Sequence, residues 1–480
     1  MKKTKIIATL GPSTDSPEVL KAMLEAGLDV ARFNFSHGEH KEHKARLELL
    51  RTVCRDTGLH VAILADTKGP EIRLGSFENG KTDLVAGNNF TLTTDSVTGN
   101  SSRVSISYAG LPDEVSSGTR ILLDDGLIEL LVESVSGNNI ITRVVNGGKI
   151  SDRKGVNVPG VRLNIPFVSA KDRLDIRFAV ENHFDFIAAS FVRNASDVME
   201  IRNELHRIDS RSQIMIISKI ENAEGVNNVD SIIDAGDGLM IARGDLGVEV
   251  EYEELPIIQK DMIKRTLSQG KPVITATQML ESMIQNPRPT RAETSDVANA
   301  IYDGTSAIML SGETAAGKYP VEALTAMSKI AERIEHSIDY RHQYFRRRGD
   351  GKTEISITNA ISHATVTTAH DLDATAILTV SMSGNTARNV TKYRPNCPII
   401  ACTPDPVVQR QLKMSWGIVP LLTQEENDTT TLFNHAVEAA TSAGYINDGE
   451  LVVLTAGVPV GHSGTTNLLK VHVVGEKILV

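Results

Sequence analysis

Eight short apolar segments alternate with amphipathic helical segments, such as Pro17–Ala26, through most of the first 340 residues. Strands that are apolar on both faces and alternate with helices form parallel sheets covered by helices. Eight such units predict a closed (β/α)₈ TIM barrel, and therefore an α/β fold. The predicted strands are Lys5–Leu10, Asp29–Phe35, Val61–Asp66, Phe186–Phe191, Ile214–Ile220, Leu239–Ala242, Val273–Thr277 and Ala307–Leu310.

The connection between the third and fourth predicted strands is far longer than the others and has turn signals such as Asp125-Gly126. A loop of this length without structure of its own is uncommon. We therefore expect an inserted β-barrel domain, Pro70–Ile165, which follows a strand end and covers the active-site face as a lid. Its predicted strands are Thr82–Thr94, Arg103–Tyr108, Ile121–Leu123, Ile128–Val135 and Ile140–Val145.

A third α/β segment follows the polar stretch Arg341–Lys352, which we interpret as a solvent-exposed linker. Its predicted strands are Ala376–Val380, Pro398–Cys402, Ile418–Leu422, Leu451–Thr455 and Lys470–Val474. We expect three domains: residues 1–69 with 166–340 form the barrel, 70–165 the lid, and 353–480 an open-sheet α/β domain.

The composition restricts the partners of the chain. Lys plus Arg number 50 and Asp plus Glu number 60, so the net charge is −10 and general nucleic-acid binding is disfavoured. No apolar stretch suggests a signal peptide or a membrane span, which predicts a cytoplasmic protein without a membrane partner. Cys54, Cys397 and Cys402 form no C-x-x-C pair and are interpreted as partly or fully buried thiols.

Polar and charged residues follow six of the eight predicted barrel strands. The loops after the strands build the active site of a (β/α)₈ enzyme, and charges at buried strand ends are costly unless they pair or bind a ligand. These loops are therefore the predicted active site. They contain Arg32–Gly38, Asp66–Arg73, Lys219–Asn222, Ala242–Gly247, Thr275–Met283 and Ser311–Thr314.

Glu221 and Asp245 end adjacent predicted strands, so their carboxylates can converge in the arrangement that suits Mg²⁺. Lys219 faces the same interior and can neutralise a phosphoryl group or an enolate. The alternative is a buried salt-bridge network that also includes Arg243. Gly244 permits close approach of a substrate carboxylate to backbone N–H groups.

Thr277 offers a hydroxyl on the next strand end. Four oxygen-bearing residues lie on two neighbouring loops and can either hold a monovalent cation or cap helices. They are Asn34, Ser36, Asp66 and Thr67.

The segment Gly312–Lys318 matches the first part of a phosphate-binding P-loop. The next residues are Tyr319 and Pro320, where Ser or Thr would have to bind Mg²⁺. We therefore interpret the segment as a barrel loop that leads into a helix started by Pro320.

Taken together, the strand-end motifs resemble those of the pyruvate kinase family, in the same order and spacing and over essentially the whole chain. The motifs are Arg32–Gly38, Asp66–Arg73, Ala242–Gly247 and Ala276–Met283. The resemblance is to bacterial members without the extra C-terminal domain that some of them carry. It implies transfer of a phosphoryl group from phosphoenolpyruvate to ADP, giving pyruvate and ATP.

The resemblance also implies residue roles. Lys219 would stabilise the phosphoryl group in transfer, Glu221 and Asp245 would bind Mg²⁺, and a K⁺ ion would be held by Asn34, Ser36, Asp66 and Thr67. Phosphoenolpyruvate would contact Arg32, Lys219, Gly244, Asp245 and Thr277. The nucleotide would contact Asn34, His37, Arg73 and Lys154. Glutamate at position 71 goes with K⁺ dependence in this family.

A regulatory site is expected in the C-terminal domain, where hydroxyls and a glycine precede a helix that extends to about Tyr393. Helix capping by Ser383 is the alternative. A later cluster, Gly461–Thr466, could close over the same ligand. Asn385 replaces a lysine of some relatives, so a monophosphate, such as a sugar monophosphate or AMP, is at least as favoured as fructose 1,6-bisphosphate. The expected contacts are Ser381, Ser383, Gly384 and Thr386.

The resemblance further suggests an allosterically regulated homotetramer. Two other functions are compatible with parts of the pattern. A Mg²⁺-dependent 2-oxo acid lyase or aldolase would share the barrel and the carboxylates, but would have no use for nucleotide contacts such as Lys154. A phosphometabolite sensor built on an inactive kinase would require loss of Arg32, Lys219, Glu221 or Asp245, and all four are present.

Overall fold

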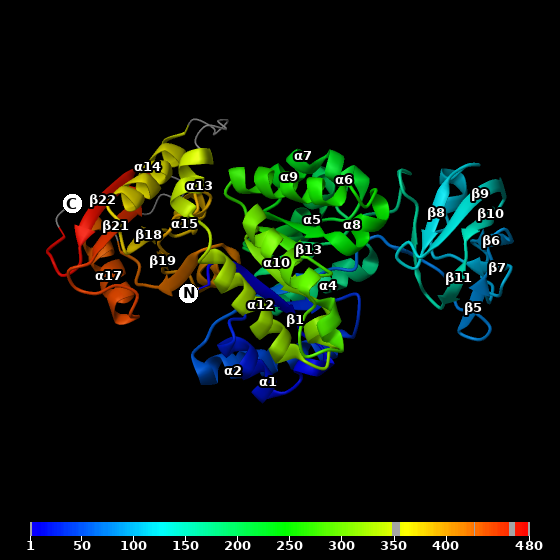
Figure 1. The fold of residues 1–480 in the computed structure, drawn as a ribbon, viewed down its shortest axis with the longest axis horizontal. Helices are drawn as coiled ribbons and strands as arrows, with labels where there is room; N and C mark the ends of the chain where they lie inside the picture. Colours follow the sequence, from blue (N-terminus) through cyan, green and yellow to red (C-terminus); the bar gives the residue numbers. More distant parts are fainter. Residues whose placement is uncertain (1, 348–355, 427, 460–465, 479–480) are drawn as a thin grey trace.

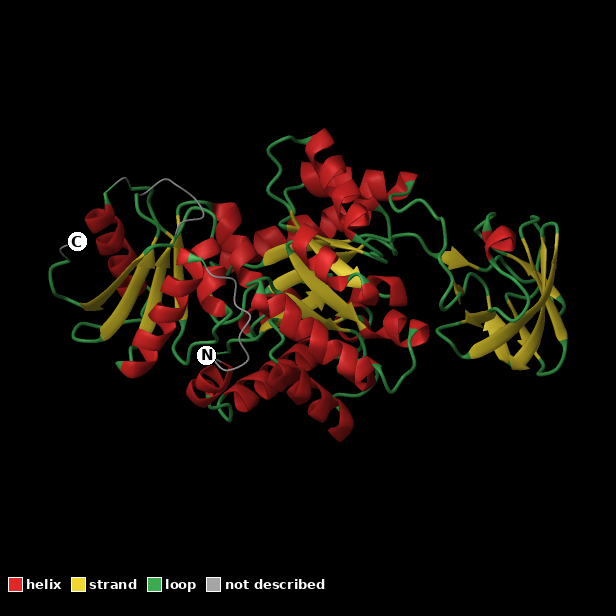
Figure 2. Cartoon of the chain, turned by 90° about the horizontal axis from the view of Figure 1, so that it is seen from above, coloured by secondary structure: helices red, strands yellow, loops and turns green. Residues whose placement is uncertain are grey.

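The computed structural model describes residues 2–347, 356–426, 428–459 and 466–478. The chain forms three bodies in a row (Figure 1), with a helix-covered barrel in the middle, a β-rich body at one end and an α/β body at the other. The view from above (Figure 2) shows the same row and the thin connection between the barrel and the β-rich body.

The central body is the predicted closed parallel barrel, and all eight predicted strands are present. The strand order around it is β1-β17-β16-β15-β14-β13-β3-β2. These strands are β1 (Lys5–Thr9), β2 (Val30–Asn34), β3 (Ala62–Asp66), β13 (Phe186–Ala189), β14 (Met215–Ile220), β15 (Gly238–Ala242), β16 (Val273–Ala276) and β17 (Ala307–Leu310).

Helices surround the barrel, and several begin at residues whose side chains cap them. Ser169 and Asp172 form a capping box at the start of α4, as Thr290 and Glu293 do at α10. The helices are α1 (Pro17–Glu25), α2 (His40–Thr57), α4 (Ala170–Glu181), α5 (Ala195–Ile208), α6 (Ala223–Asn227), α7 (Val229–Ala235), α8 (Arg243–Glu249), α9 (Leu255–Ser268), α10 (Arg291–Asp303), α11 (Gly312–Ala315) and α12 (Pro320–Glu335), with 3₁₀ turns at η1 (Pro12–Thr14) and η2 (Glu281–Ile284).

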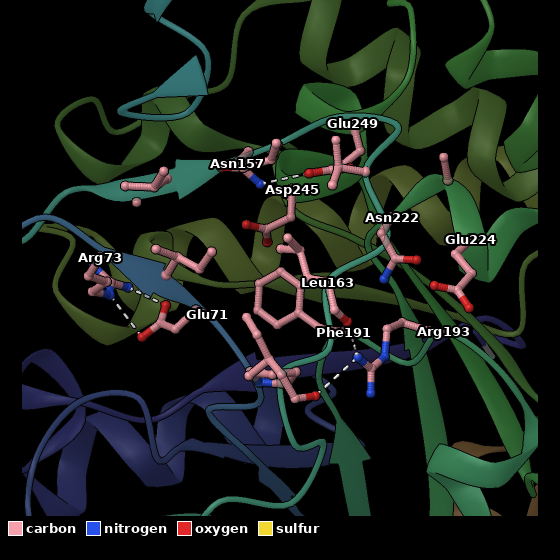
Figure 3. Close-up of a pocket in the computed structure, with 18 of the residues that line it drawn as sticks. Glu71, Arg73, Asn157, Leu163, Phe191, Arg193, Asn222, Glu224, Asp245 and Glu249 are labelled. Carbon is pink, nitrogen blue, oxygen red and sulfur yellow. Dashed lines mark hydrogen bonds and ion pairs between the residues drawn. The ribbon is translucent and has the colours of Figure 1, made fainter. Parts of the chain in front are cut away.

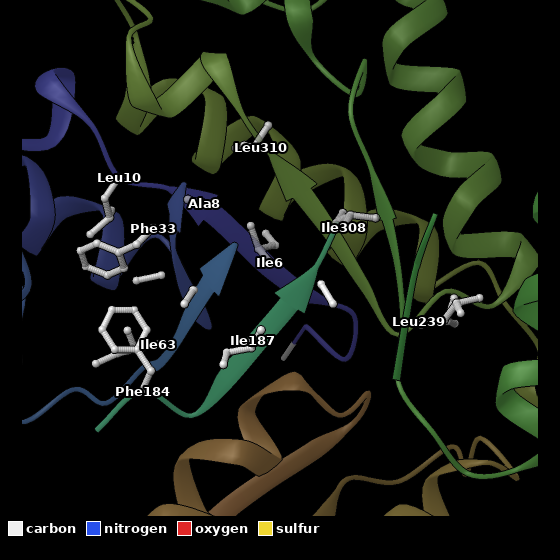
Figure 4. Packing of buried hydrophobic residues seen from close by; sticks show 14 of the residues in the cluster. Ile6, Ala8, Leu10, Phe33, Ile63, Phe184, Ile187, Leu239, Ile308 and Leu310 are labelled. Atoms are coloured by element: carbon white, nitrogen blue, oxygen red, sulfur yellow. The ribbon is translucent and has the colours of Figure 1, made fainter. Parts of the chain in front are cut away.

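Alternate residues of each barrel strand enter two separate cores, because successive side chains of a strand point to opposite faces. Ile6 and Ala8 of β1 pack outward against the helices (Figure 4), whereas Ile7 packs inside the barrel. The inner core also contains Met414 from the C-terminal body. The C-terminal body therefore contributes to the packing of the barrel interior.

The inserted segment folds as a β domain, with strands in all five expected segments and three outside them, β4, β11 and β12. Its main sheet has the order β4-β12-β8-β9-β10-β6-β7, and β11 pairs with β5. The elements are β4 (Ile72–Arg73), β5 (Lys81–Leu84), β6 (Asn89–Thr93), β7 (Arg103–Ser105), α3 (Leu111–Glu114), β8 (Arg120–Leu123), β9 (Ile128–Ser136), β10 (Asn139–Asn146), β11 (Gly148–Ser151) and β12 (Gly155–Asn157).

Two backbone hydrogen bonds join the edges of this seven-stranded sheet. Gly75 N donates to Ser105 O over 2.7 Å, and Ser107 N donates to Arg73 O over 2.9 Å. The sheet thereby curls into a barrel-like body. The prediction of one strand over Thr82–Thr94 was wrong, because a turn at Val85 to Asn88 separates β5 from β6 and lets them pair with different partners.

The C-terminal body is an open five-stranded sheet of order β20-β19-β18-β21-β22, in which β22 is antiparallel to β21. Each of its five strands was predicted. The elements are α13 (Tyr340–Arg347), α14 (Ile357–Asp371), β18 (Ala376–Val380), α15 (Asn385–Thr391), β19 (Ile399–Thr403), α16 (Pro406–Gln411), η3 (Leu412–Met414), β20 (Ile418–Leu422), α17 (Thr429–Ser442), β21 (Leu451–Ala456) and β22 (Leu468–Val473).

The prediction of a solvent-exposed linker from Arg341 was wrong for its first part, where Tyr340–Arg347 forms α13. Tyr340 and Tyr344 lie one helical turn apart and are both buried. The ring of Tyr344 lies 5.2 Å from that of His370, edge to face. The sequence prediction considered the charges of this stretch and overlooked Tyr340 and Tyr344. Residues 348–352 of the expected linker lie outside the described residues.

No helix in the described ranges combines the length and the apolar character needed to cross a membrane.

Candidate active site

A cleft of about 730 Å³ separates the lid from the strand-end loops of the barrel (Figure 3). Arg73 and Lys154 line it from the lid, and His37 and Asp245 line it from the barrel. Asn157 Nδ2 donates to Glu249 Oε1 over 3.1 Å and so links the two sides. The lid thus covers the carboxyl ends of the strands, as its insertion after the third barrel strand predicted.

Four charged side chains form one continuous network at the strand ends. Lys219 Nζ lies 3.1 Å from Asp66 Oδ1 and 3.0 Å from Glu221 Oε1. Arg32 Nε donates to Asp66 Oδ2 over 2.7 Å, and its Nη1 donates to Thr9 Oγ1 over 2.8 Å. All four charged residues are buried.

Residues after β13 complete this network and were missed by the sequence analysis. Lys219 Nζ donates to Ser190 Oγ over 2.7 Å, and Ser190 Oγ donates to Thr67 O over 2.7 Å. Phe191 N donates to Glu221 Oε2 over 2.7 Å. The available signal was the polar residue at the end of the fourth predicted strand, which we counted as part of that strand.

Interactions within the network shift the pKa values of its members. Burial alone would raise the pKa of Asp66, but Arg32 and Lys219 hold it below its usual value. Burial lowers the pKa of Lys219, but the charges of Asp66 and Glu221 outweigh that effect and raise it. Lys219 is therefore a permanent cation at the floor of the site.

Unlike that of Asp66, the pKa values of the Glu221 and Asp245 carboxyl groups are raised. Burial raises the pKa of Glu221, and the neighbouring negative charges of Asp245 and Asp66 add to this rise. Burial also raises the pKa of Asp245. The buried carboxylate of Glu221 and the half-buried carboxylate of Asp245 thus share the charge of one ammonium group, that of Lys219.

Thr277 and Gly244 form the expected neighbouring pair. The hydroxyl of Thr277 accepts a hydrogen bond from Gly244 N over 2.8 Å. Thr277 has φ 68°, a strained conformation for a β-branched residue. Arg243 stabilises this turn through its bond from Nη2 to Thr277 O, at 2.8 Å, and pairs with Asp296 at 2.7 Å. Arg243 is therefore not a member of the Lys219 network, contrary to the salt-bridge alternative.

The four oxygen-bearing residues of the proposed cation site come from the ends of two paired strands and the loops that follow them, since Asn34 lies opposite Asp66 in the β2–β3 register. Asn34 Oδ1 accepts a hydrogen bond from Ser36 N over 3.1 Å, and Thr67 Oγ1 donates to Ala188 O over 3.3 Å. None of the four is the N-cap of a described helix; α2, which follows Ser36, is preceded by Glu39.

The lid contributes charged pairs at the rim of the cleft. Arg73 Nη2 lies 2.7 Å from Glu71 Oε2, and Lys68 Nζ lies 2.8 Å from Glu71 Oε1. Lys154 Nζ lies 2.8 Å from Asp124 Oδ1. Both Arg73 and Lys154 are partly exposed to the cleft, where they can meet an anionic ligand.

The C-terminal loop, defined as residues 381–386, does not have the helix cap at Ser383 that was the alternative to a regulatory site. Gly384 is the N-cap of α15 with φ 74°, and its N–H donates to Ser381 Oγ over 3.1 Å. Ser383 Oγ is buried and has no hydrogen-bond partner within the described parts of the chain. Capping by Ser383 is therefore not observed, and α15 ends at Thr391 rather than near Tyr393.

Thr386 Oγ1 lies 2.9 Å from Thr466 Oγ1, which brings the two expected effector segments together. The other residues of the second segment, 461–465, lie outside the described residues.

The P-loop-like segment forms a barrel loop, as expected. Glu313 accepts hydrogen bonds from Leu280 N over 3.1 Å and from Ser311 N over 2.7 Å. Pro320 is the first residue of α12. Glu313 therefore holds two strand-end loops together.

The fold and the site define an enzyme class. A (β/α)₈ barrel places a buried ammonium group and two carboxylates at its mouth, under a lid that presents further cations. This combination suits phosphoryl transfer, which depends on positioning and on neutralising negative charge.

Comparisons with known proteins identify the family. The model of the pyruvate kinase barrel domain matches residues 1–324, and that of the pyruvate kinase alpha/beta domain matches residues 359–472. A pyruvate kinase of Geobacillus stearothermophilus is 52% identical over 477 residues, which cover 99% of this chain and 81% of that relative. One of Clostridium acetobutylicum is 48% identical over 475 residues, covering 99% of this chain and 100% of the relative.

A crystal structure of a pyruvate kinase from Cryptosporidium parvum superimposes with a TM-score of 0.92 at 41% identity, covering 98% of this chain and 96% of that one. The chain belongs to the pyruvate kinase family. It is a glycolytic kinase that transfers the phosphoryl group of phosphoenolpyruvate to ADP, with pyruvate and ATP as products and a divalent metal as cofactor. The lyase alternative is not supported.

Proposed function

We propose that Lys219 is the catalytic residue of this reaction and stabilises the phosphoryl group in transfer. The carrying observation is its position, with Asp66, Ser190 and Glu221 fixing the ammonium group at 3.1, 2.7 and 3.0 Å. A cation held in place by three partners needs little reorganisation when negative charge develops next to it. Pyruvate production from phosphoenolpyruvate, assayed with and without ADP, tests the function: ADP-independent production would contradict it.

We propose Mg²⁺ as the divalent ion, with Glu221 and Asp245 as its protein ligands. Their donor set fits, because Mg²⁺ favours one or two carboxylates together with substrate oxygens, and the two carboxylates share the charge of one ammonium group, that of Lys219. When bound, Mg²⁺ supplies positive charge to the enolate and phosphoryl oxygens. Asp245→Ala should raise the Mg²⁺ concentration needed for half-maximal velocity; an unchanged requirement would contradict this assignment.

We assign phosphoenolpyruvate to the floor of the cleft, with its phosphate at Arg32 and its carboxylate at the Gly244 and Asp245 backbone and the Thr277 hydroxyl. The hydrogen bonds of Arg32 to Asp66 and Thr9 engage Nε and Nη1, which supports a substrate contact through Nη2. The strained turn at Thr277 supports a dedicated binding loop, since such strain is characteristic of functional sites. The ADP phosphates are assigned to Arg73 and Lys154, with Asn34 and His37 nearby.

A K⁺ ion is assigned to Asn34, Ser36, Asp66 and Thr67, and Glu71 is expected to make activity depend on it. The strand pairing of Asn34 with Asp66 supports this set. We also propose domain boundaries at residues 69, 165 and 340. We propose further that the enzyme is a cytoplasmic homotetramer.

We further propose that a phosphorylated metabolite binds at the C-terminal loop and lowers the half-saturating concentration of phosphoenolpyruvate. The buried hydroxyl of Ser383 and the contact between Thr386 and Thr466 support this site. Ser383→Asp should abolish activation and leave basal turnover intact, because it adds a negative charge where the anion would bind. Activation equal to that of the wild type would place the effector elsewhere.

A further inference from the structure

A second cavity, of about 520 Å³, lies at the end of the barrel opposite the active site, where the barrel meets the C-terminal body. Its walls come from the last turns of α2, from the start of β3, from the residue His183 before β13, and from α16. The motifs of the catalytic site and the C-terminal loop contribute none of its described lining. The cavity is therefore separate from both sites assigned above.

The cavity combines apolar walls with an excess of positive charge. Its charged and titratable groups, apart from the thiol of Cys54, are Arg51, Arg55 and Arg410 together with His60 and His183; Asp and Glu are absent from its described lining. Leu50, Val61, Ile63 and Val407 supply the apolar surface. This concentration of cations is notable in a chain whose net charge is −10.

One buried carboxylate lies behind these cations and neutralises only part of their charge. Asp185 Oδ1 accepts a hydrogen bond from Arg410 Nε over 2.8 Å, and Asp185 Oδ2 accepts one from Ile63 N over 2.8 Å. Arg51 Nη2 donates to the neutral carbonyl of Asn182 over 2.6 Å. Burial and the charge of Arg410 lower the pKa of Arg51, and the acids that oppose this are Asp185 and Glu48.

We propose that this cavity is a binding site for a small organic anion, a phosphate or carboxylate attached to an apolar body. The guanidinium groups of Arg51, Arg55 and Arg410 take the charge, and the apolar walls take the body. Guanidinium groups suit both anions because their planar donors match either pair of oxygens.

The site lies at one end of a barrel strand whose other end leads into the catalytic centre. Arg51 and Arg55 belong to the barrel and Arg410 to the C-terminal body, so one anion would bridge the two bodies. Asp185 directly precedes β13, and the chain beyond this strand carries Ser190, the partner of Lys219. One short buried strand thus joins the wall of the cavity to the active site.

Cys54 lines the cavity and provides a local reporter. The full chain is treated with N-ethylmaleimide alone, with phenyl phosphate or with benzoate, and alkylation of each cysteine is followed by peptide mass spectrometry. A ligand at tenfold its dissociation constant should slow Cys54 alkylation about tenfold, with Cys397 unchanged. Protection by phenyl phosphate but not benzoate identifies a phosphate site, and the reverse identifies a carboxylate site.

The double variant Arg51→Gln with Arg55→Gln should lose this protection. Arg46→Gln is the matched control, because Arg46 lies on the same helix but pairs with Asp15 outside the cavity. Calorimetric titration of phenyl phosphate and benzoate into both variants gives an independent readout, with binding heat expected in the control alone. Equal protection or equal heat in the two variants, or neither signal in the wild type, would overturn the proposal.

Discussion

The strand-end network and the rim of the lid both carry cations toward the same cleft, but they hold them in different environments. At the strand ends, the Lys219 side chain is 10% exposed and that of its partner Asp66 is 1% exposed. At the rim, the side chains of Arg73 and Lys154 are 38% and 40% exposed. Each cation has an acidic partner within about 3 Å, so solvent access rather than pairing is what distinguishes the two regions.

The difference in exposure determines in which ion pairs a ligand oxygen can replace the acidic partner. Removing one member of a buried pair costs about 3–5 kcal/mol, because the remaining charge stays desolvated. An exposed pair contributes about 0–1 kcal/mol and can be replaced by a ligand oxygen at little cost. The network therefore suits a fixed catalytic charge, and the rim suits a nucleotide that must bind and leave in every cycle.

The largest effect is expected when the network loses the ammonium group of Lys219. Lys219→Met should leave phosphoenolpyruvate binding within about tenfold of the wild type, yet lower turnover by about 10²-fold or more, since its charge matters most in the transition state. Steady-state kinetics and equilibrium binding measure the two quantities. A fall in turnover of less than about tenfold would show that Lys219 is not the phosphoryl stabiliser.

A smaller effect is expected when Lys219 is kept but loses a partner. Ser190→Ala removes the hydrogen bond at 2.7 Å and should lower kcat about tenfold with little change in KM for phosphoenolpyruvate. Ser190→Thr retains a hydroxyl and should restore most of kcat, which identifies Ser190 as a positioning residue. If Ser190→Ala lowers only the thermal stability, the residue has a purely structural role.

At the rim, a substitution should affect one substrate and spare the other. Arg73→Gln should raise KM for ADP about tenfold, the equivalent of about 1.4 kcal/mol, with KM for phosphoenolpyruvate nearly unchanged. Arg143→Gln is the control, because Arg143 is an exposed lid residue that pairs with Glu133 away from the cleft. Equal increases in both KM values would place Arg73 outside the nucleotide site.

The smallest effect is expected from a change of charge at Glu71, which pairs with both Arg73 and Lys68. The wild type should require K⁺, and Glu71→Lys should reduce this requirement several-fold, because an ammonium group can supply the positive charge that K⁺ brings. Activity is compared in K⁺ and in a bulky organic cation. Equal wild-type activity in the two salts would contradict the prediction.

Local patterns predicted the strands of the barrel and of the C-terminal sheet, because buried parallel strands are continuous apolar runs. They also predicted Lys219, Glu221 and Asp245 as one group, since the ends of parallel strands must meet at one edge. They failed where an element depends on distant partners. The strand β12 is only three residues long and exists because it pairs with β4 and β8.

By itself, the sequence determined the strands of the barrel and of the C-terminal sheet, the order of the domains and the set of strand-end motifs, all of which follow from side-chain periodicity and spacing. Tertiary structure decided which further charges join Lys219 and Glu221. Lys219 and Asp66 are separated by 153 residues. Arg243 is much closer to Lys219 in the sequence than Asp66 is, yet it bonds to Thr277 and Asp296 instead. The physical reason is that a buried charge takes the partner that the closed barrel brings within reach, and closure depends on the pairing of β1 with β17 at opposite ends of the barrel sequence.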